Sequence, residues 1–220
     1  MSVRDDPGTA GRLDGRGARD ALARFEESFE AHRVELDDLD RRSGDGDFGS
    51  NLAGAMDRIA DGLATDATDT PGGVFGVVAN AFMHIGGTGG PLFGMLFTRL
   101  SRAAGSEPSI GLVELAAGAE AGLAGIQRLG GAAPGDKTMI DALDPAVAAL
   151  QASLAMDLSD GLEAAASAAR AGADATADLI ARRGRASYVG EAARGVRDPG
   201  ALTVALLFEA LAAASKPTDR

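Results

Sequence analysis

Three aspartates with the spacing D-x4-D-x-D lie in and just before a glycine-rich stretch, in "DRRSGDGDFGSN". Asp40 follows Leu36 by four residues, so it falls on the inward stripe of a helix, whereas Asp37 falls on another face. Asp45 and Asp47 lie in a tight glycine turn that can fold both back toward Asp40. Three carboxylates at one point need a cation or protons, and hard oxygen ligands suit Mg²⁺. The spacing predicts a metal site; the alternative it leaves open is a solvated acidic patch of Asp-Gly turns.

The same stretch satisfies G-x-G-x-x-G, but other named phosphate or metal motifs fail on spacing or context. A dinucleotide-binding turn needs a strand before it, and here a long amphipathic helix precedes residues 44–49. An EF-hand counted from Asp45 would have Met56 in place of its bidentate glutamate. A Walker A loop read from "GAAPGDKT" has Asp136 where its second glycine belongs.

Backbone N–H groups offer a second kind of chemistry beside the carboxylates. Ser50 or Asn51 can cap a new helix whose free N–H groups point back at the acidic loop. "GGTGGP" at 86–91 offers a second nest of N–H groups, with a helix opening at Pro91. Its alternative is a glycine-rich hinge or close helix packing. Together these features predict phosphate oxygens held by helix N-termini and neutralised by carboxylate-bound Mg²⁺.

The elements that position these loops are helical nearly everywhere. Apolar residues step by three and four from Leu22 to Leu39 and again over 139–150, and no segment alternates with period two. Asp198-Pro199 predicts an N-cap and first turn of a last, buried helix through about Ser215. Further helices are expected near 50–64, 73–85, 91–104, 109–129 and 159–182. The fold class is therefore all-α, with about eight helices.

Four connections hold the unusual residues: 40–51, 86–91, 134–138 and 184–200. Helical hairpins bring alternate loops to one end of a bundle, so several of these loops can form one site. We expect a flexible tail over 1–18 and a single domain over 19–216.

The amino-acid composition excludes several classes of partner and of metal site. A formal net charge of −11 argues against nucleic acid or an anionic membrane as partner, and the apolar runs are too short for a membrane span. No cysteine is present, so a metal must be held by oxygen or histidine, and the expected location is cytoplasmic. His32 and His84 are expected to be packed or capping residues rather than a phosphohistidine. Lys137, one of only two lysines, is either a helper at the site or a loop lysine that pairs with Asp136 or Asp141, and the sequence leaves both open.

Four motifs in order resemble the L subunit of dihydroxyacetone kinase, a domain that also forms the nucleotide-binding half of single-chain kinases. They are "LDRRSGDGDFGSN", "GGTGGPLFG", "GDKTMIDAL" and "GRASYVGE" followed by "DPGA", and the likeness runs from about residue 20 to 212. The resemblance implies an antiparallel eight-helix barrel with a nucleotide pocket at one end.

The resemblance also implies site residues and ligands. Asp40, Asp45 and Asp47 would carry Mg²⁺, two ions in this family, bridging the phosphates of ADP or ATP. The residues implied to contact the nucleotide are Gly49, Ser50, Asn51, Thr88, Gly89, Met139, Arg185, Asp198, Pro199 and Gly200. Two departures stand out: Phe48 replaces a usual histidine, and Gly89 replaces a usual second hydroxyl residue in the phosphate loop.

The implied activity is phosphotransfer to dihydroxyacetone or a related small ketose held on a separate K subunit. The donor is either exchanging ATP or bound ADP rephosphorylated by a protein of the phosphoenolpyruvate phosphotransferase system, and the residues do not choose between them. A different class of function stays open because of Phe48 and Gly89. In that alternative the chain is a nucleotide-sensing adaptor that turns nothing over.

Overall fold

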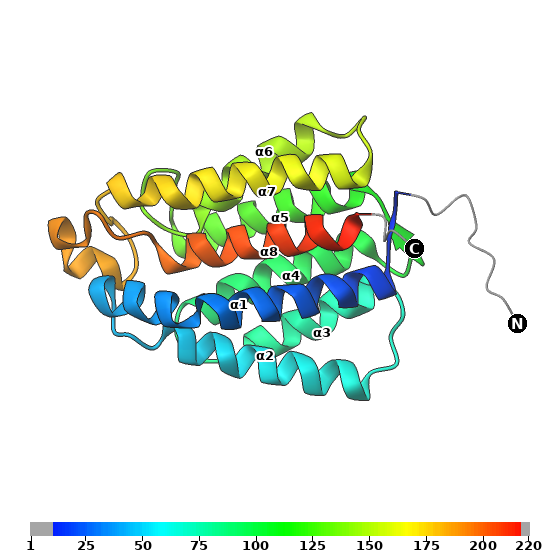
Figure 1. Cartoon of the computed structure of the whole chain (residues 1–220), viewed down its shortest axis with the longest axis horizontal. Coiled ribbons are helices and arrows are strands. Elements are labelled where there is room, and N and C mark those ends of the chain that lie inside the picture. Colours follow the sequence, from blue (N-terminus) through cyan, green and yellow to red (C-terminus); the bar gives the residue numbers. More distant parts are fainter. Residues whose placement is uncertain (1–10, 217–220) are drawn as a thin grey trace, which may run out of the picture.

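The computed structural model describes residues 11–216, and eight α-helices make up most of this part of the chain (Figure 1). Their bounds are α1 Gly15–Ser43, α2 Phe48–Thr65, α3 Pro71–Met83, α4 Gly89–Ala104, α5 Leu112–Gly130, α6 Ile140–Ala152, α7 Leu158–Ala175 and α8 Pro199–Ser215. Three short 3₁₀ helices, η1 Thr176–Asp178, η2 Arg185–Tyr188 and η3 Gly190–Ala193, lie between α7 and α8. The all-α prediction is confirmed.

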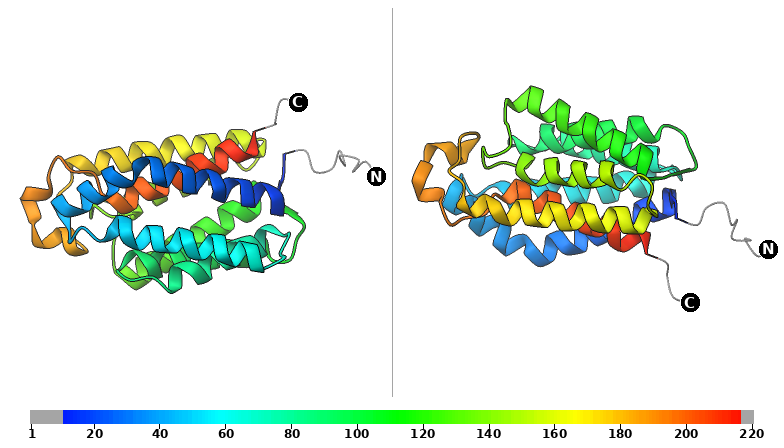
Figure 2. Two further views of the ribbon diagram at one scale, coloured as in Figure 1. Left: turned by 60° about the horizontal axis from the view of Figure 1, so that its bottom comes forward. Right: turned by 90° about the horizontal axis from the view of Figure 1, so that it is seen from above.

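The helices form a closed ring. Each packs against the next in the sequence, and α8 returns to pack against α1. Two further views show the elongated barrel that results, with helices running alternately up and down (Figure 2). The connections α1–α2 and α7–α8 lie at one end, and the start of α1 and the end of α8 lie at the other. Alternate loops therefore do meet at one end of the bundle.

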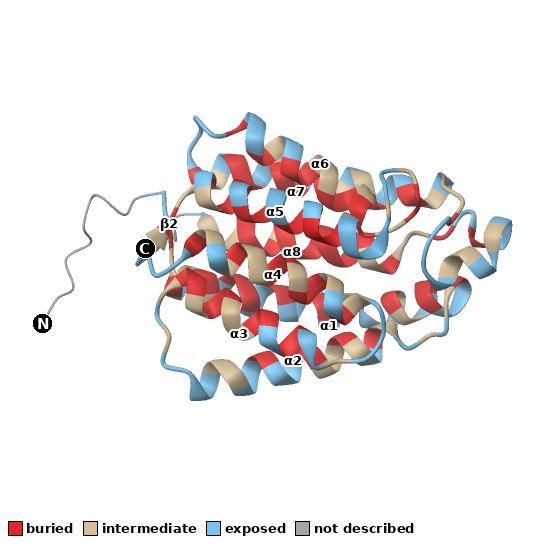
Figure 3. Ribbon diagram, turned by 180° about the vertical axis from the view of Figure 1, so that it is seen from behind, coloured by how far each residue is buried: buried red, intermediate tan, exposed pale blue. Residues whose placement is uncertain are grey.

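Buried apolar faces point into the ring along every helix (Figure 3). The largest fully buried side chains include the phenylalanines of α3 and α4, and Phe82 stacks on Phe93 and Phe97 with ring centroids 5.3 and 5.8 Å apart. Helix α8 is buried along most of its length, as its apolar sequence predicts. This aromatic cluster supports the pocket end of α3 and α4.

The N-terminal boundary differs from the prediction of a tail over 1–18. Leu13–Asp14 (β1) pairs antiparallel with Ser109–Ile110 (β2), and the Asp14 side chain caps α1 by accepting from Gly17 N at 2.7 Å. Residues 1–10 lie outside the described residues. Two-residue strands are too short to leave a period-two pattern, which is why the sequence gives no sign of them.

Three helix ends also differ from the sequence-based expectations. Helix α2 begins at Phe48, after Asp47, rather than at Ser50 or Asn51. Helix α4 begins at Gly89, after Thr88, rather than at Pro91. Helix α7 ends at Ala175 rather than near residue 182, because the chain turns into η1 at the buried Thr176. The earlier starts of α2 and α4 bring their free N–H groups closer to the glycine-rich loops.

Within residues 11–216, we find no helix with both the length and the apolar character that crossing a membrane requires.

Candidate functional site

A cavity of about 180 Å³ opens at the end of the barrel where the α1–α2 and α7–α8 connections meet. All four of the loops singled out by sequence contribute to its walls. Of the predicted site residues, the walls include Asp40, Asp45, Asn51, Thr88, Gly89, Met139, Arg185, Asp198, Pro199 and Gly200. Asp47, Gly49 and Ser50 lie next to wall residues in the chain but do not line the cavity. The structure thus gathers most of the predicted site into one place.

Asp40 links the end of α1 to the start of α2. Its side chain is buried at 9% exposure, as expected for a residue on the inward stripe, and its Oδ2 accepts a hydrogen bond from Phe48 N at 2.9 Å. This bond satisfies one of the free N–H groups in the first turn of α2. Asp40 therefore fixes the turn between α1 and α2.

Asp45 and Asp47 are more exposed and face different surroundings. Asp45 forms an ion pair with Arg185 of η2, so a cationic side chain stands beside this carboxylate. Asp47 occupies the N-cap position of α2 without a side-chain hydrogen bond to the helix. Across residues 11–216, no three His, Cys, Asp or Glu side chains are placed together as a metal site. The three aspartates are therefore close in the sequence, at the end of α1 and in the turn before α2, but their carboxylates do not converge on one point.

Asp37 is a carboxylate whose place the sequence analysis missed. It was expected on another face of its helix, yet its Oδ1 is buried and has no hydrogen-bond partner among the described residues. The carboxylate lies so close to Gly49 that a Cβ at that position would overlap Oδ1. A buried carboxylate oxygen without a partner, next to the first turn of α2, is a group that a cation would stabilise. Together with the all-oxygen donor set, it makes these residues suitable for Mg²⁺.

Two helix N-termini face the same cavity. Helices α2 and α4 begin at Phe48 and Gly89, and neither N-cap side chain bonds its helix. Phe48 N is occupied by Asp40, and the N–H groups from Gly49 and Gly89 onward in the first turns are available to an anion. The Asn51 amide lies against the loop before α4, 3.2 Å from where a Cβ on Gly86 or Gly87 would be. The acidic loop and the "GGTGGP" loop are thus neighbours in space.

The two departures from the family pattern touch each other. A Cβ on Gly89 would lie 3.6 Å from the ring of Phe48, at ordinary van der Waals distance. The ring is half-buried against the core and forms part of the cavity wall. An apolar ring and a missing side chain therefore occupy one spot, where the resemblance implies an imidazole and a hydroxyl group.

The opposite wall is formed by Met139 and the start of α8. Met139 is buried at 4% exposure, and its Cβ lies 3.4 Å from where a Cβ on Gly200 would be. Asp198 caps α8 by accepting from Ala201 N at 2.7 Å. This wall combines apolar surface with one carboxyl group.

Burial raises the pKa of Asp198 to about 7, and the nearby Asp141 carboxylate adds to the rise. The hydrogen bond from Ala201 N and the charge of Lys137 act in the opposite direction. Without ligand, the folded chain therefore binds a proton at Asp198 that the unfolded chain releases near its ordinary pKa of 3.8.

We expect this proton to make stability depend on pH. The contribution of Asp198 is fully present below about pH 4 and is lost as the pH rises through about 7, because the charged form is disfavoured in the fold. Asp198→Asn keeps an N-cap side chain but cannot ionise. The variant should therefore gain more in Tm, relative to wild type, at pH 8 than at pH 5. Thermal unfolding without nucleotide or metal measures this, and an equal shift at both pH values would contradict it.

Lys137 and the two histidines complete the set of singled-out residues. Lys137 does not pair with Asp136 or Asp141: it is buried, and its Nζ donates to main-chain carbonyls instead. The Asp141 carboxylate instead accepts hydrogen bonds from Gly135 N and Thr138 N at 2.5 and 2.8 Å.

His84 is exposed at the end of α3, outside the cavity walls, with Nδ1 2.7 Å from Asn80 O. His32 is half-buried, with Nδ1 2.7 Å from Ser28 O. Neither histidine lies in the site.

Comparison with known families gives a match to the DAK2 domain over residues 42–213. The chain is 37% identical over 198 residues to the PEP-dependent dihydroxyacetone kinase ADP-binding subunit DhaL of Escherichia coli, covering 89% of this chain and 94% of that one. It is 38% identical over 192 residues to the ADP-binding subunit DhaL of PEP-dependent dihydroxyacetone kinase 1 of Listeria innocua, covering 85% of this chain and 90% of that one. L-erythrulose 1-kinase of Mycolicibacterium smegmatis is 37% identical, with 86% of this chain but only 34% of that protein aligned.

Solved structures agree with this match. The native dihydroxyacetone kinase of C. freundii superposes with a TM-score of 0.67 at 28% identity. The same enzyme in complex with AMP-PNP and Mg²⁺ gives 0.66 at 29%. Both comparisons cover 97% of this chain, which spans 37% and 36%, respectively, of the C. freundii chains.

Proposed function

We propose that this chain, which belongs to the DAK2 domain family, is the nucleotide-binding subunit of a kinase that phosphorylates a small ketose. The observation that carries the proposal is the cavity whose walls combine an acidic loop with two helix N-termini. Carboxylates alone would repel a phosphate and N–H groups alone would not hold a cation, so the combination suits a nucleotide bound with Mg²⁺. The nucleotide/Mg²⁺-binding domain is predicted over 19–216.

We assign each group of residues a role in binding Mg²⁺ or the nucleotide according to its chemistry. Asp40, Asp45 and Asp47 would hold Mg²⁺, which neutralises phosphate charge when bound. The N–H groups at the starts of α2 and α4, from Gly49 and Gly89 onward, bind phosphate oxygens. Arg185 adds positive charge at the same place, and the apolar Met139 wall excludes water beside the base. Positioning and charge neutralisation are what phosphoryl transfer requires of a protein, so no nucleophilic side chain is needed.

The acceptor and the donor are inferred from relatives of similar length. The Escherichia coli and Listeria innocua relatives are named ADP-binding subunits of PEP-dependent kinases, and a Lactococcus lactis relative, 35% identical, is named PTS-dependent. These names favour ADP as a resident cofactor, rephosphorylated by a phosphotransferase-system protein, over exchanging ATP. We infer that a separate K subunit holds the ketose and that the reaction is cytoplasmic. Erythrulose kinases among the relatives extend the acceptor class beyond dihydroxyacetone.

The test is phosphate transfer in a reconstituted system. The chain is combined with its K subunit, Mg²⁺ and dihydroxyacetone or erythrulose, and either ATP or the relay proteins with phosphoenolpyruvate. We expect ketose phosphate to form only when the chain and the K subunit are both present. Product formation without this chain would contradict the proposal.

A nucleotide-sensing adaptor is the second candidate, favoured by the contact between Phe48 and Gly89. Replacing an imidazole and a hydroxyl group with apolar surface removes two polar groups from the cavity while keeping the backbone donors. In this case Mg²⁺·ADP binds tightly, yet neither donor supports turnover. The same reconstituted assay therefore separates the two candidates.

A further inference from the structure

Lys137 is a buried ammonium group for which the proposed phosphotransfer gives no role. It is 1% exposed, and burial lowers its pKa, whereas the carboxylates of Asp198, Asp141 and Asp178 act in the opposite direction. None of these carboxylates lies within ion-pair distance of Nζ among the described residues. Its partners are two main-chain carbonyls, Thr176 O at 2.6 Å and Val196 O at 2.5 Å.

The backbone of Lys137 adopts a conformation that is unfavourable for a residue with a side chain. Its φ of +62° is the only positive value at a non-glycine residue within 11–216. That region strains residues with a Cβ, and glycine would adopt it freely. Such strain persists where the surroundings hold the residue, and here the two hydrogen bonds from Nζ hold its side chain.

The two carbonyls bracket one segment of the chain, residues 177–195, which follows α7 and precedes α8. A main-chain hydrogen bond from Gly195 N to Ala177 O, 2.8 Å long, joins the two ends of this segment directly. Asp198 N donates to Thr176 Oγ1 at 2.9 Å, which connects the start of the segment to the N-cap of α8. Lys137 thus joins a third element, the α5–α6 loop, to both ends of this segment.

The segment carries side chains over the cavity, and only a few contacts fix it between its ends: Arg182 N donates to Asp136 O at 3.0 Å, and Ala181 and Ala193 are buried. Arg185 reaches across to Asp45, and Arg183 lies 3.6 Å from Asp136. The tip is exposed, with Tyr188 at 90%, and only short 3₁₀ turns give it regular structure. Because the exposed tip that carries Arg185 makes few contacts, its place depends on how the two ends of the segment are held.

We propose that Lys137 is a positioning residue of the nucleotide site: by tying both ends of segment 177–195, it sets Arg185 at the cavity wall. The proposal rests on the proposed function in that the ligand so positioned is Mg²⁺·ADP. Lys137 itself need not touch the nucleotide.

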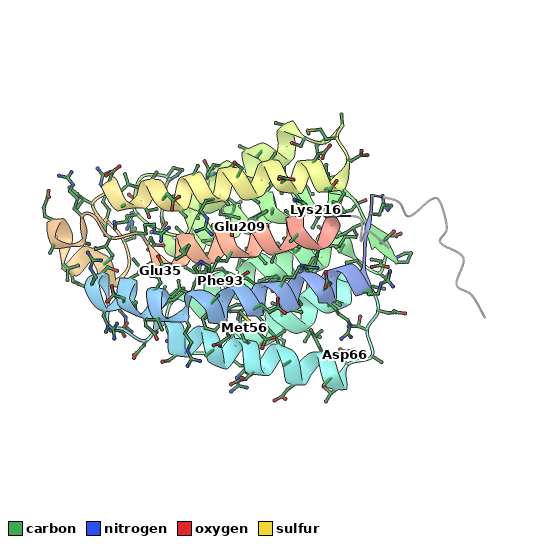
Figure 4. The ribbon with its side chains drawn as sticks, viewed as in Figure 1. Glu35, Met56, Asp66, Phe93, Glu209 and Lys216 are labelled. Atoms are coloured by element: carbon green, nitrogen blue, oxygen red, sulfur yellow. The ribbon has the colours of Figure 1, made fainter. Side chains whose placement is uncertain are left out.

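The first test follows the segment without ligand. Hydrogen exchange is compared by mass spectrometry in the wild-type chain, in Lys137→Met, which has similar length but no donor, and in Lys137→Arg, which keeps a positive charge and N–H donors. Lys216→Met is the matched control, because this other lysine is 55% exposed at the far end of α8 (Figure 4). We expect exchange in 177–195 to accelerate by about tenfold or more in Lys137→Met, with α3 and α4 unchanged. The arginine variant and the control should remain nearer wild type.

The second test links the segment to the ligand. Isothermal titration should give a Kd for Mg²⁺·ADP about tenfold higher in Lys137→Met than in wild type. If Lys137 acts through Arg185, the double variant Lys137→Met/Arg185→Met should bind no more weakly than Arg185→Met alone. A purely structural lysine would give additive losses instead.

Other results of these two tests would overturn the proposal. Unchanged exchange in 177–195, or a loosened segment with unchanged affinity, would overturn the positioning role. If Lys137→Met does not fold, Lys137→Gln is put through the same two measurements: its shorter, uncharged side chain should also speed exchange in 177–195 and raise the Kd for Mg²⁺·ADP. If the wild-type chain itself fails to bind Mg²⁺·ADP, the proposed function falls and the positioning role with it. Hydrogen exchange would then still show whether Lys137 holds the segment, so the two failures can be told apart.

Discussion

Replacing Asp45 and Asp47 together with alanine should abolish Mg²⁺-dependent binding of ADP. The expected rise in Kd is at least about 100-fold, since even partners outside the metal's own ligands change metal affinity 10- to 100-fold. Two of three carboxylates are lost, and Asp40 alone is already committed to Phe48 N. Isothermal titration of ADP with Mg²⁺, and with chelator in its place, measures the effect.

The same variant makes a second prediction about metal-free binding. Asp45→Ala releases Arg185 from its ion pair, so ADP affinity in chelator should stay the same or rise. Stability should change little, because an ion pair this exposed contributes roughly 0–1 kcal/mol. Asp38→Ala is the matched control: this aspartate is 54% exposed on α1 and pairs only with Arg41 and Arg42. Mg²⁺-dependent affinity equal to wild type in the double variant would refute the metal assignment.

The fold and half of the site follow from local patterns in the sequence. Helix periodicity places Asp40 four residues after the buried Leu36, and the structure buries it accordingly. Asp198-Pro199 predicts the start of α8 because the cap and the proline are adjacent in the chain. Features set by neighbours within one or two helical turns are therefore predictable without a structure.

The rest depends on residues far apart in the chain. Lys137 bonds to carbonyls 39 and 59 residues away, and main-chain acceptors leave no mark in a sequence. The partner of Asp45 is Arg185, on a segment with no periodicity. Asp37 was assigned by helix phase alone, which could not show that Gly49 of the next helix would cover it. The burial of the Asp37 oxygen and the contacts of Lys137 are set by tertiary packing, which local sequence patterns do not show.

The barrel's ability to hold this end in place depends on the aromatic cluster under the cavity. Phe82 is fully buried on α3, lines the cavity, and stacks on Phe93 and Phe97 of α4. Phe82→Ala should lower the free energy of unfolding by about 3–5 kcal/mol, the usual loss when a buried phenylalanine is truncated. Urea unfolding followed by circular dichroism measures this.

The control for Phe82→Ala is the next residue along α3, Met83, which is 56% exposed. Met83→Ala makes a comparable truncation on the outer face of the same helix and should stay within about 0.5 kcal/mol of wild type. If Phe82→Ala costs no more than Met83→Ala, the cluster does not support the cavity end. If it costs several kcal/mol, raising the Mg²⁺ concentration with ADP present should recover part of the loss, because a ligand that binds only the folded chain stabilises it. Such recovery would show that the wall remaining after truncation still holds the nucleotide, and would tie the core of the barrel to its binding site.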